Sequence, residues 1–161
     1  MDKYKERNCR LCDNKLKTIL NLGDIAVSDF VSDNSFQLAP LDFCDCENCG
    51  LIQLRHDVER DTMYMKYYYQ SGLNPSMIKE LTDVANRLKG YINLKEGDAI
   101  LDIGANDGTF LQNFKGYYRV GIDPAKNIAD KAKENCDLFI NDYFPSVELK
   151  NIKFKGISNI S

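Results

Sequence analysis

The chain has 161 residues, enough for one domain or for one domain with a small appendage. Its apolar fraction of 43% is typical of a globular protein with a buried core, and its net charge of −3 argues against a nucleic-acid binder with a basic face. The sequence contains neither the apolar region of a signal peptide nor a stretch that could cross a membrane. We therefore expect a cytoplasmic protein with no nucleic-acid or membrane partner.

Residues 1–56 hold five of the six cysteines, four of them in two Cys-x-x-Cys pairs. In a cytoplasmic chain such pairs favour metal binding over disulfides, because each pair forms a tight turn whose two thiolates reach one ion. The sequence therefore predicts a β-rich module around a structural Zn²⁺. Buried apolar cysteines are the alternative, but they do not explain the pairing. The predicted ligands are Cys9, Cys12, Cys46 and Cys49, and Cys44 is left out because it lies too close to Cys46.

Residues 57–92 predict a helical linker with a tyrosine-rich segment. Its first part is a short helix that leaves the helical path at the run of three tyrosines. Phenol rings offer both a flat face and a hydroxyl donor, so Tyr67 and Tyr69 are candidates for a wall over a substrate. Ordinary packing of tyrosines between two modules is the alternative. Residues 74–91 predict an amphipathic helix, because apolar residues recur at helical spacing after Asn74, a favourable N-cap.

Residues 93–161 alternate short apolar strands with helical stretches, which predicts parallel βαβ units and an α/β fold. The expected strands are 99–103, 118–122 and 137–140, the expected helices are 107–114 and 125–135, and a fourth strand begins within 151–161.

The central motif follows the first of these strands. Asp102, Gly104 and Gly108 form the pattern Asp-x-Gly-x-x-x-Gly, and the glycines let the backbone approach a ligand at the carboxyl end of the strand. The spacing is not the Gly-x-Gly-x-x-Gly of dinucleotide-binding proteins, and Asn106 and Asp107 fill the turn. Carboxylates in the turn repel a pyrophosphate but attract the ammonium group of S-adenosylmethionine. The turn therefore favours S-adenosylmethionine over NAD.

Asp123 ends the second strand, where a Rossmann-type site places an acid that accepts the ribose hydroxyls. A strand-end cap at Asp102 and a turn residue at Asp123 are the alternatives, but the two acids occur in register. Asp142, after the third strand, is a candidate for the adenine edge, and Tyr143 or Phe144 for the adenine face; an ordinary turn is the alternative there. The predicted residues of the donor site are Asp102, Gly104, Asn106, Asp107, Gly108, Asp123 and Asp142.

Five stretches of the chain combine these motifs: Cys9–Cys12, Cys46–Leu54, Tyr67–Gly72, Leu101–Thr109 and Gly121–Asn127. Their order and spacing resemble the sugar C-methyltransferases, which act on nucleotide-linked deoxysugars. The resemblance covers the chain from about residue 9 to residue 144. The combination is far more specific than any one of the motifs.

The resemblance implies a zinc-binding module followed by a Rossmann-like class I methyltransferase domain, of which residues 93–161 are the N-terminal part. It implies Zn²⁺ at the four paired cysteines, S-adenosylmethionine at the turn and at Asp123, and a Tyr67–Ser71 segment that folds back over the active site. In the family, a carbon next to a keto group is deprotonated and the enolate attacks the sulfonium methyl group.

The sequence departs from the family where the general acid and base are expected, because these residues lie beyond Ser161. We therefore expect an incomplete sheet and little or no methyltransferase activity from this chain alone. A truncated gene product, a deliberately shortened piece and one half of a split enzyme all fit, and in the last case a second chain supplies the rest. The alternative functions are an O- or N-methyltransferase on another small molecule, and a non-catalytic fragment that binds zinc and S-adenosylmethionine.

Overall fold

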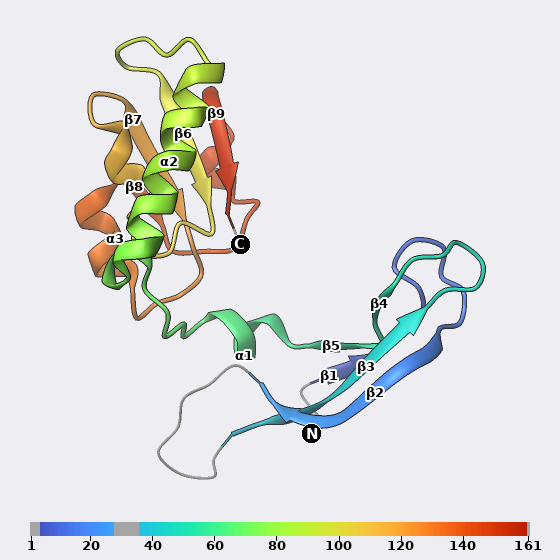
Figure 1. Cartoon of the computed structure of the whole chain (residues 1–161). Helices are drawn as coiled ribbons and strands as arrows, with labels where there is room; N and C mark the ends of the chain where they lie inside the picture. Colours follow the sequence, from blue (N-terminus) through green and yellow to red (C-terminus); the bar gives the residue numbers. More distant parts are fainter. Residues whose placement is uncertain (1–3, 28–35, 161) are drawn as a thin grey trace. The chain divides into compact units, whose positions relative to one another are not determined.

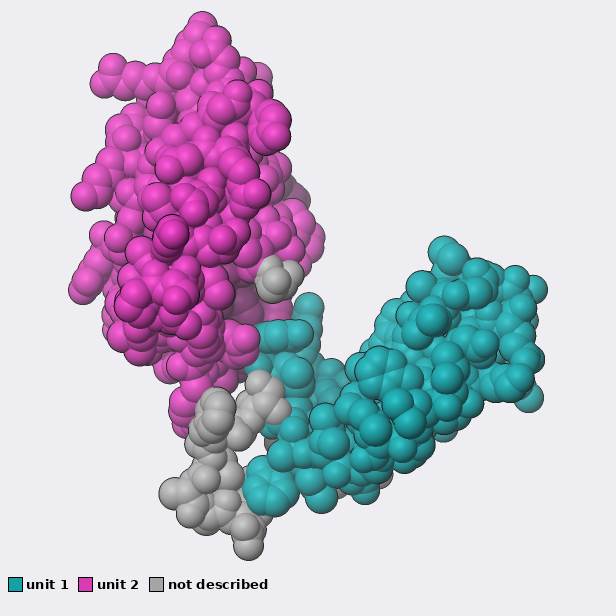
Figure 2. Space-filling view, viewed as in Figure 1, with its two compact units in different colours: residues 1–64 teal, residues 65–161 magenta. Residues whose placement is uncertain are grey.

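The computed structural model describes residues 4–27 and 36–160. The chain divides into two compact units, Met1–Tyr64 and Met65–Ser161, coloured separately in Figure 2. The stretch 57–92, for which the sequence predicts a linker, is shared between them, because residues 65–92 belong to the second unit. In the described part of the chain, none of the helices combines the length and the apolar character that a membrane span needs.

The first unit consists of two small antiparallel sheets (Figure 1). One pairs β1 (Tyr4–Glu6) with β5 (His56–Val58), and the other has the order β2-β3-β4. The core of this unit consists largely of cysteine side chains, because Cys9, Cys44 and Cys46 cluster there with Leu16. The remaining elements are β2 (Lys17–Ala26), β3 (Leu38–Asp45), β4 (Gln53–Leu54) and the helix α1 (Arg60–Tyr64).

The second unit contains a parallel four-stranded sheet of order β8-β7-β6-β9. The central strand β6 is almost completely buried and reads Ala-Ile-Leu-Asp-Ile, as expected for a strand covered on both faces. The parallel sheet, together with the β-rich cysteine module, confirms the predicted α/β fold class. The strands are β6 (Ala99–Ile103), β7 (Tyr118–Ile122), β8 (Leu138–Ile140) and β9 (Phe154–Asn159).

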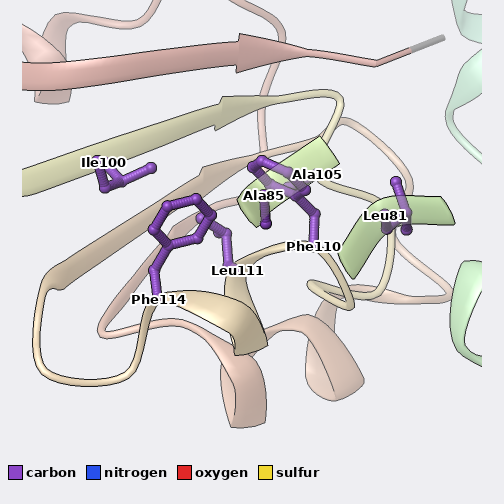
Figure 3. Packing of buried hydrophobic residues seen from close by; sticks show 7 residues of the cluster. All are labelled: Leu81, Ala85, Ile100, Ala105, Phe110, Leu111 and Phe114. Carbon is purple, nitrogen blue, oxygen red and sulfur yellow. The ribbon is translucent and has the colours of Figure 1, made fainter. Parts of the chain in front are cut away.

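One face of this sheet is covered by α2 (Pro75–Tyr91), which begins where the sequence predicts. The Asn74 side chain accepts hydrogen bonds from the N–H groups of Ser76 and Met77, which satisfies the free end of the helix. Figure 3 shows how Leu81 and Ala85 of α2 share a core with Ile100 of β6 and with residues that follow the turn. The other members of this core are Ala105, Phe110, Leu111 and Phe114.

Two predicted helices are shorter than expected. Residues 107–114 form a turn followed by the 3-10 helix η2 (Leu111–Phe114), because Gly108 adopts a positive φ of 76° and the Asp107 side chain binds the Thr109 N–H and hydroxyl. The helix α3 (Ala129–Asn135) begins four residues later than predicted from 125, because the N–H of Ala125 binds the Asp123 carboxylate instead of entering a helical ladder.

Two further 3-10 helices complete the described elements of the second unit. They are η1 (Ser71–Leu73), before α2, and η3 (Val147–Leu149), between β8 and β9.

Candidate functional site

The four paired cysteines come together at one end of the first unit. Their Sγ atoms all lie within 4.8 Å of one another, with 3.6 Å between Cys9 and Cys49 and 3.4 Å between Cys12 and Cys46. Zn–S bonds of about 2.3 Å in a tetrahedron separate the sulfur atoms by about 3.8 Å, so this set fits one Zn²⁺. Cys44 is buried nearby, but its thiol contacts Thr18 Oγ1 and the backbone O of Asp42 and does not belong to the set.

Local hydrogen bonds favour the ionised form at two of these sulfur atoms, because they lower the pKa of Cys9 and of Cys12. The Leu11 N–H donates to Cys9 Sγ at 3.4 Å, and the Asn14 amide donates to Cys12 Sγ at the same distance. The Asn14 hydrogen bonds lower the pKa of Cys12 to about 6, so this thiol ionises more readily than an ordinary cysteine. A thiolate is the form that binds zinc, and four sulfur ligands fill a tetrahedral site, so the set is suited to a structural ion.

The predicted donor-site residues of the glycine turn lie at the carboxyl ends of β6 and β7. Gly104 has a φ of 74°, and a Cβ atom built on it would meet nothing within 4 Å, so its backbone is open to an approaching group. Gly108, with a φ of 76°, instead lies against α3, because a Cβ atom there would come within 2.7 Å of Asn135 Cβ. One glycine therefore opens the turn and the other allows close packing beneath it.

Two acidic residues lie beside this turn. Asp102 ends up buried on β6 and accepts a hydrogen bond of 2.7 Å from Ser158 Oγ of β9. Burial raises the pKa of Asp102 to about 7, the Ser158 hydrogen bond lowers it, and the nearby Asp123 charge raises it. Burial also raises the pKa of Asp123, whose carboxylate accepts N–H groups from Ala125 and Asn106, each at 2.9 Å.

Asp107 lies inside the protein, and its side chain is completely buried. One carboxylate oxygen accepts from the hydroxyl and N–H of Thr109, and the other accepts from the N–H of Gly72 and lies 3.5 Å from Lys131 Nζ. These bonds make Asp107 a support of the turn, and a direct role in donor binding stays a prediction. Asp142 is exposed after β8 and accepts from the N–H of Tyr143, so its adenine role also stays a prediction.

The tyrosine-rich segment belongs to the second unit and runs beside the turn. The Asn106 side chain bonds to the backbone of Tyr69 and Ser71, and the Asn127 side chain bonds to the backbone of Tyr67. Tyr67 and Tyr69 keep 36% and 41% of their surface exposed, so neither residue is buried by the rest of the second unit. The structure thus brings the predicted substrate wall and the predicted donor turn into one place.

Comparison with known proteins gives two findings. Residues 9–64 match a family model described as "Putative zinc binding domain". Over 99 residues the chain is 34% identical to the C-methyltransferase NovU of Streptomyces niveus, and the match covers 60% of this chain and 24% of that relative. The resemblance to the sugar C-methyltransferases is confirmed. The chain spans about a quarter of the length of this curated relative.

The family match includes all four predicted zinc ligands, so the predicted zinc-binding module is supported by sequence and by geometry alike. Sequence reasoning missed the residues that hold these parts in place. Gln53 donates to Cys9 Sγ at 3.2 Å, and Asn127 binds the tyrosine-rich segment. Both residues lie within the stretches that resemble the methyltransferases, and this resemblance was the signal available in the sequence. An amide side chain, however, carries no chemistry that a spacing pattern can reveal.

Proposed function

We propose that this chain supplies the donor-binding part of an S-adenosylmethionine-dependent methyltransferase that acts on a carbon of a nucleotide-linked keto-deoxysugar. The observation that carries the proposal is the pair of acids, Asp102 and Asp123, beside the open backbone of Gly104. S-adenosylmethionine supplies an electrophilic methyl group on a sulfonium ion. The proposed role of the described residues is to bind and orient that donor.

The charge of the site favours such a ligand. Burial draws Asp102 and Asp123 both toward the protonated form, and the charge of Asp123 raises the pKa of Asp102 further. A cationic ligand reverses this balance, because it stabilises both carboxylates in their charged state. A dinucleotide pyrophosphate would add two negative charges to the same place. This comparison supports S-adenosylmethionine over NAD.

The sugar substrate rests on the family resemblance and on the exposed tyrosines near the turn. Phenol hydroxyls and ring faces suit a sugar nucleotide, which offers both hydroxyl groups and an aromatic base. We propose that the general base and the remaining substrate contacts come from elements outside these 161 residues, from further residues or from a second chain. The zinc module has a structural role in this proposal, because its sulfur set leaves no ligand position open.

Isothermal titration calorimetry on the zinc-loaded chain tests the donor site. We expect S-adenosylmethionine and S-adenosylhomocysteine to bind with a stoichiometry of one and NAD to give no heat. Asp123→Asn should weaken both bindings about tenfold or more, because a neutral amide accepts ribose hydroxyls less strongly than a carboxylate. Asp130→Asn on α3 is the matched control, since that side chain is fully exposed and makes its ion pair with Lys133.

A titration in which NAD binds and S-adenosylmethionine does not would overturn the donor assignment. The sugar assignment is tested separately by incubating the chain with radiolabelled S-adenosylmethionine and a nucleotide-linked keto sugar. We expect label to enter the sugar only after a chain that carries the missing base is added. Label transferred by the isolated chain would contradict the proposed location of that base.

A further inference from the structure

Residues 67–72, which we call the tyrosine strap, are held to the rest of the second unit through their backbone. Two asparagine side chains supply four of the hydrogen bonds to this backbone, one asparagine from the loop after β6 and one from the loop after β7. The rings of Tyr67 and Tyr69 take no part in these hydrogen bonds, which hold the backbone that carries them.

Asn127 binds one residue of the tyrosine strap twice. Its Oδ1 accepts from the Tyr67 N–H at 2.9 Å, and its Nδ2 donates to the Tyr67 carbonyl at 2.8 Å. The amide thus presents one donor and one acceptor to a single residue, as a neighbouring strand does in an antiparallel sheet. Neither an aspartate nor a leucine of similar size can do both.

Asn106 makes the equivalent pair of bonds further along the tyrosine strap. Its Nδ2 donates to the Tyr69 carbonyl at 2.9 Å, and its Oδ1 accepts from the Ser71 N–H at 3.0 Å. Tyr67, Tyr69 and Ser71 are spaced two residues apart, and all of these hydrogen bonds form ahead of or at the first residue of η1. The two amides therefore fix the register of the tyrosine strap against the ends of β6 and β7.

The anchor at Asn106 is also joined to the proposed donor site. Its own N–H donates to Asp123 Oδ2 at 2.9 Å, and Asp123 is the predicted acceptor of the ribose hydroxyls. Asn106 has a φ of 50°, in the left-handed region of backbone conformation. In this conformation its backbone N–H donates to Asp123 while its side chain binds the tyrosine strap. A ligand that binds the Asp123 carboxylate therefore contacts the group that accepts the backbone hydrogen bond of Asn106, the residue that anchors the tyrosine strap.

We propose that Asn106 and Asn127 are positioning residues, which set the tyrosine strap beside the donor site and couple its order to donor binding. The coupling rests on the proposed function, because it requires a ligand at Asp123. The anchoring does not, since all four hydrogen bonds form within the chain itself. The reaction class that benefits is one in which Tyr67 and Tyr69 contact the substrate only after the donor has bound.

Amide hydrogen exchange on the full zinc-loaded chain, read by NMR, tests the anchoring without any ligand. We expect Asn127→Ala to speed exchange at Tyr67 about tenfold, and Asn106→Gly to do the same at Ser71. Glycine is chosen at 106 because it retains the positive φ while it removes the amide. Asn127→Asp should give an intermediate rate, since it keeps the acceptor for the N–H and loses the donor for the carbonyl. Asn113→Ala, whose amide bonds locally to the Phe110 carbonyl, is the control.

The coupling is tested by adding S-adenosylhomocysteine to the same samples. We expect exchange at Tyr67 and Ser71 to slow severalfold in the parent chain and to stay fast in the two variants. Unchanged ligand-free exchange in both variants would overturn the anchoring. Binding of S-adenosylhomocysteine with no change of exchange in the tyrosine strap would overturn the coupling and leave the proposed function intact, whereas absence of binding in calorimetry would overturn the donor site and the coupling together.

Discussion

The Asp107 carboxylate accepts a hydrogen bond of 2.8 Å from the backbone N–H of Gly72, so the turn after β6 holds the end of the tyrosine strap. The same carboxylate lies 3.5 Å from Lys131 Nζ, and Lys131 also reaches the Gln70 side chain at 3.3 Å. A charged group with no exposed surface requires such partners, since an unpaired buried carboxylate is strongly destabilising. The segment before α2 and the turn after β6 therefore fold as one substructure.

Gly72 is expected to tolerate no side chain. A Cβ atom at this position would lie 2.8 Å from both Asp107 Oδ2 and Thr109 Oγ1, which belong to buried residues that bond to each other, so any shift disturbs those bonds. We expect Gly72→Ala to destabilise the second unit by about 2 kcal/mol, the cost of losing a hydrogen bond to a charged group. Thermal unfolding followed by circular dichroism should show a midpoint several degrees lower.

The control for this substitution is Gly90→Ala in α2. Gly90 is exposed, and its added Cβ would meet nothing within 4 Å. Alanine is the better helix former by roughly 0.5–1 kcal/mol, so this variant should unfold at a slightly higher temperature. Equal effects of the two substitutions would show that the contact between Gly72 and Asp107 contributes nothing specific.

Asp102 should make donor binding depend on pH near neutrality. Burial raises its pKa to about 7 in the folded chain, against an ordinary value of 3.8. An acid with a raised folded pKa favours folding most below its unfolded pKa, and that contribution is lost as the pH rises through 7. A cationic ligand favours the ionised form, so its affinity should fall as the pH decreases below 7 and its binding should release protons.

The proton release is measured by calorimetry of S-adenosylmethionine binding at pH 7 in buffers of different ionisation enthalpy. We expect a fraction of one proton to be released per ligand by the parent chain. Asp102→Asn should abolish that release and should also flatten the dependence of stability on pH between 4 and 7. Identical heats in all buffers would contradict a role for Asp102 at the donor site.

The sequence predicted the strands and the long helix well, because these depend on local patterns. Buried apolar runs mark β6 and β7, and Asn74 with Pro75 marks the start of α2. It failed after β6, where a helix was expected from residue 107. There the Asp107 side chain bonds to the distant Gly72 and to Thr109, and no local pattern reports a bond between residues so far apart in the chain.

The candidate sites show the same division between residues that local patterns predict and residues that only the fold reveals. Pairs of cysteines and acids at strand ends are short-range signals, and the structure brings together the four cysteines and, separately, Asp102 and Asp123. The residues that position them were invisible, because Asn127 and Gln53 act through amide hydrogen bonds to partners far away in the sequence. Their amides became meaningful only once the fold had placed Tyr67 and Cys9 beside them.

Removal of zinc should unfold the first unit and leave the second intact. The core of residues 1–64 consists largely of the zinc-binding sulfur atoms, so the metal contributes directly to its folding energy. We expect one zinc per chain by elemental analysis, and loss of amide protection in 4–27 and 36–64 after chelation. Cys46→Ala should abolish zinc binding, whereas Cys44→Ala should retain it, because the Cys44 thiol lies outside the sulfur set. Zinc loss in both variants would contradict the assigned ligand set.

Gln53 should strengthen zinc binding through Cys9. Its Nε2 donates to Cys9 Sγ at 3.2 Å, and its Oε1 accepts from the Arg10 N–H at 3.0 Å, so one buried amide joins the ligand to its neighbour in the same turn. Residues that hydrogen-bond a metal ligand typically change metal affinity by about 10–100-fold when replaced. We therefore expect Gln53→Leu to weaken zinc binding about tenfold in competition with a chromophoric chelator.

Gln53→Glu separates the effect of the hydrogen bond from that of shape. Glutamate has nearly the same size and keeps an acceptor for the Arg10 N–H, but it replaces the donor to Cys9 with a negative charge beside the thiolates. It should weaken zinc binding more than leucine does, because four thiolates and one Zn²⁺ already carry a net negative charge. Gln112→Leu, an exposed site in the second unit, is the control. An affinity for the glutamate variant equal to that of the parent chain would show that the amide donor has no part in holding the metal.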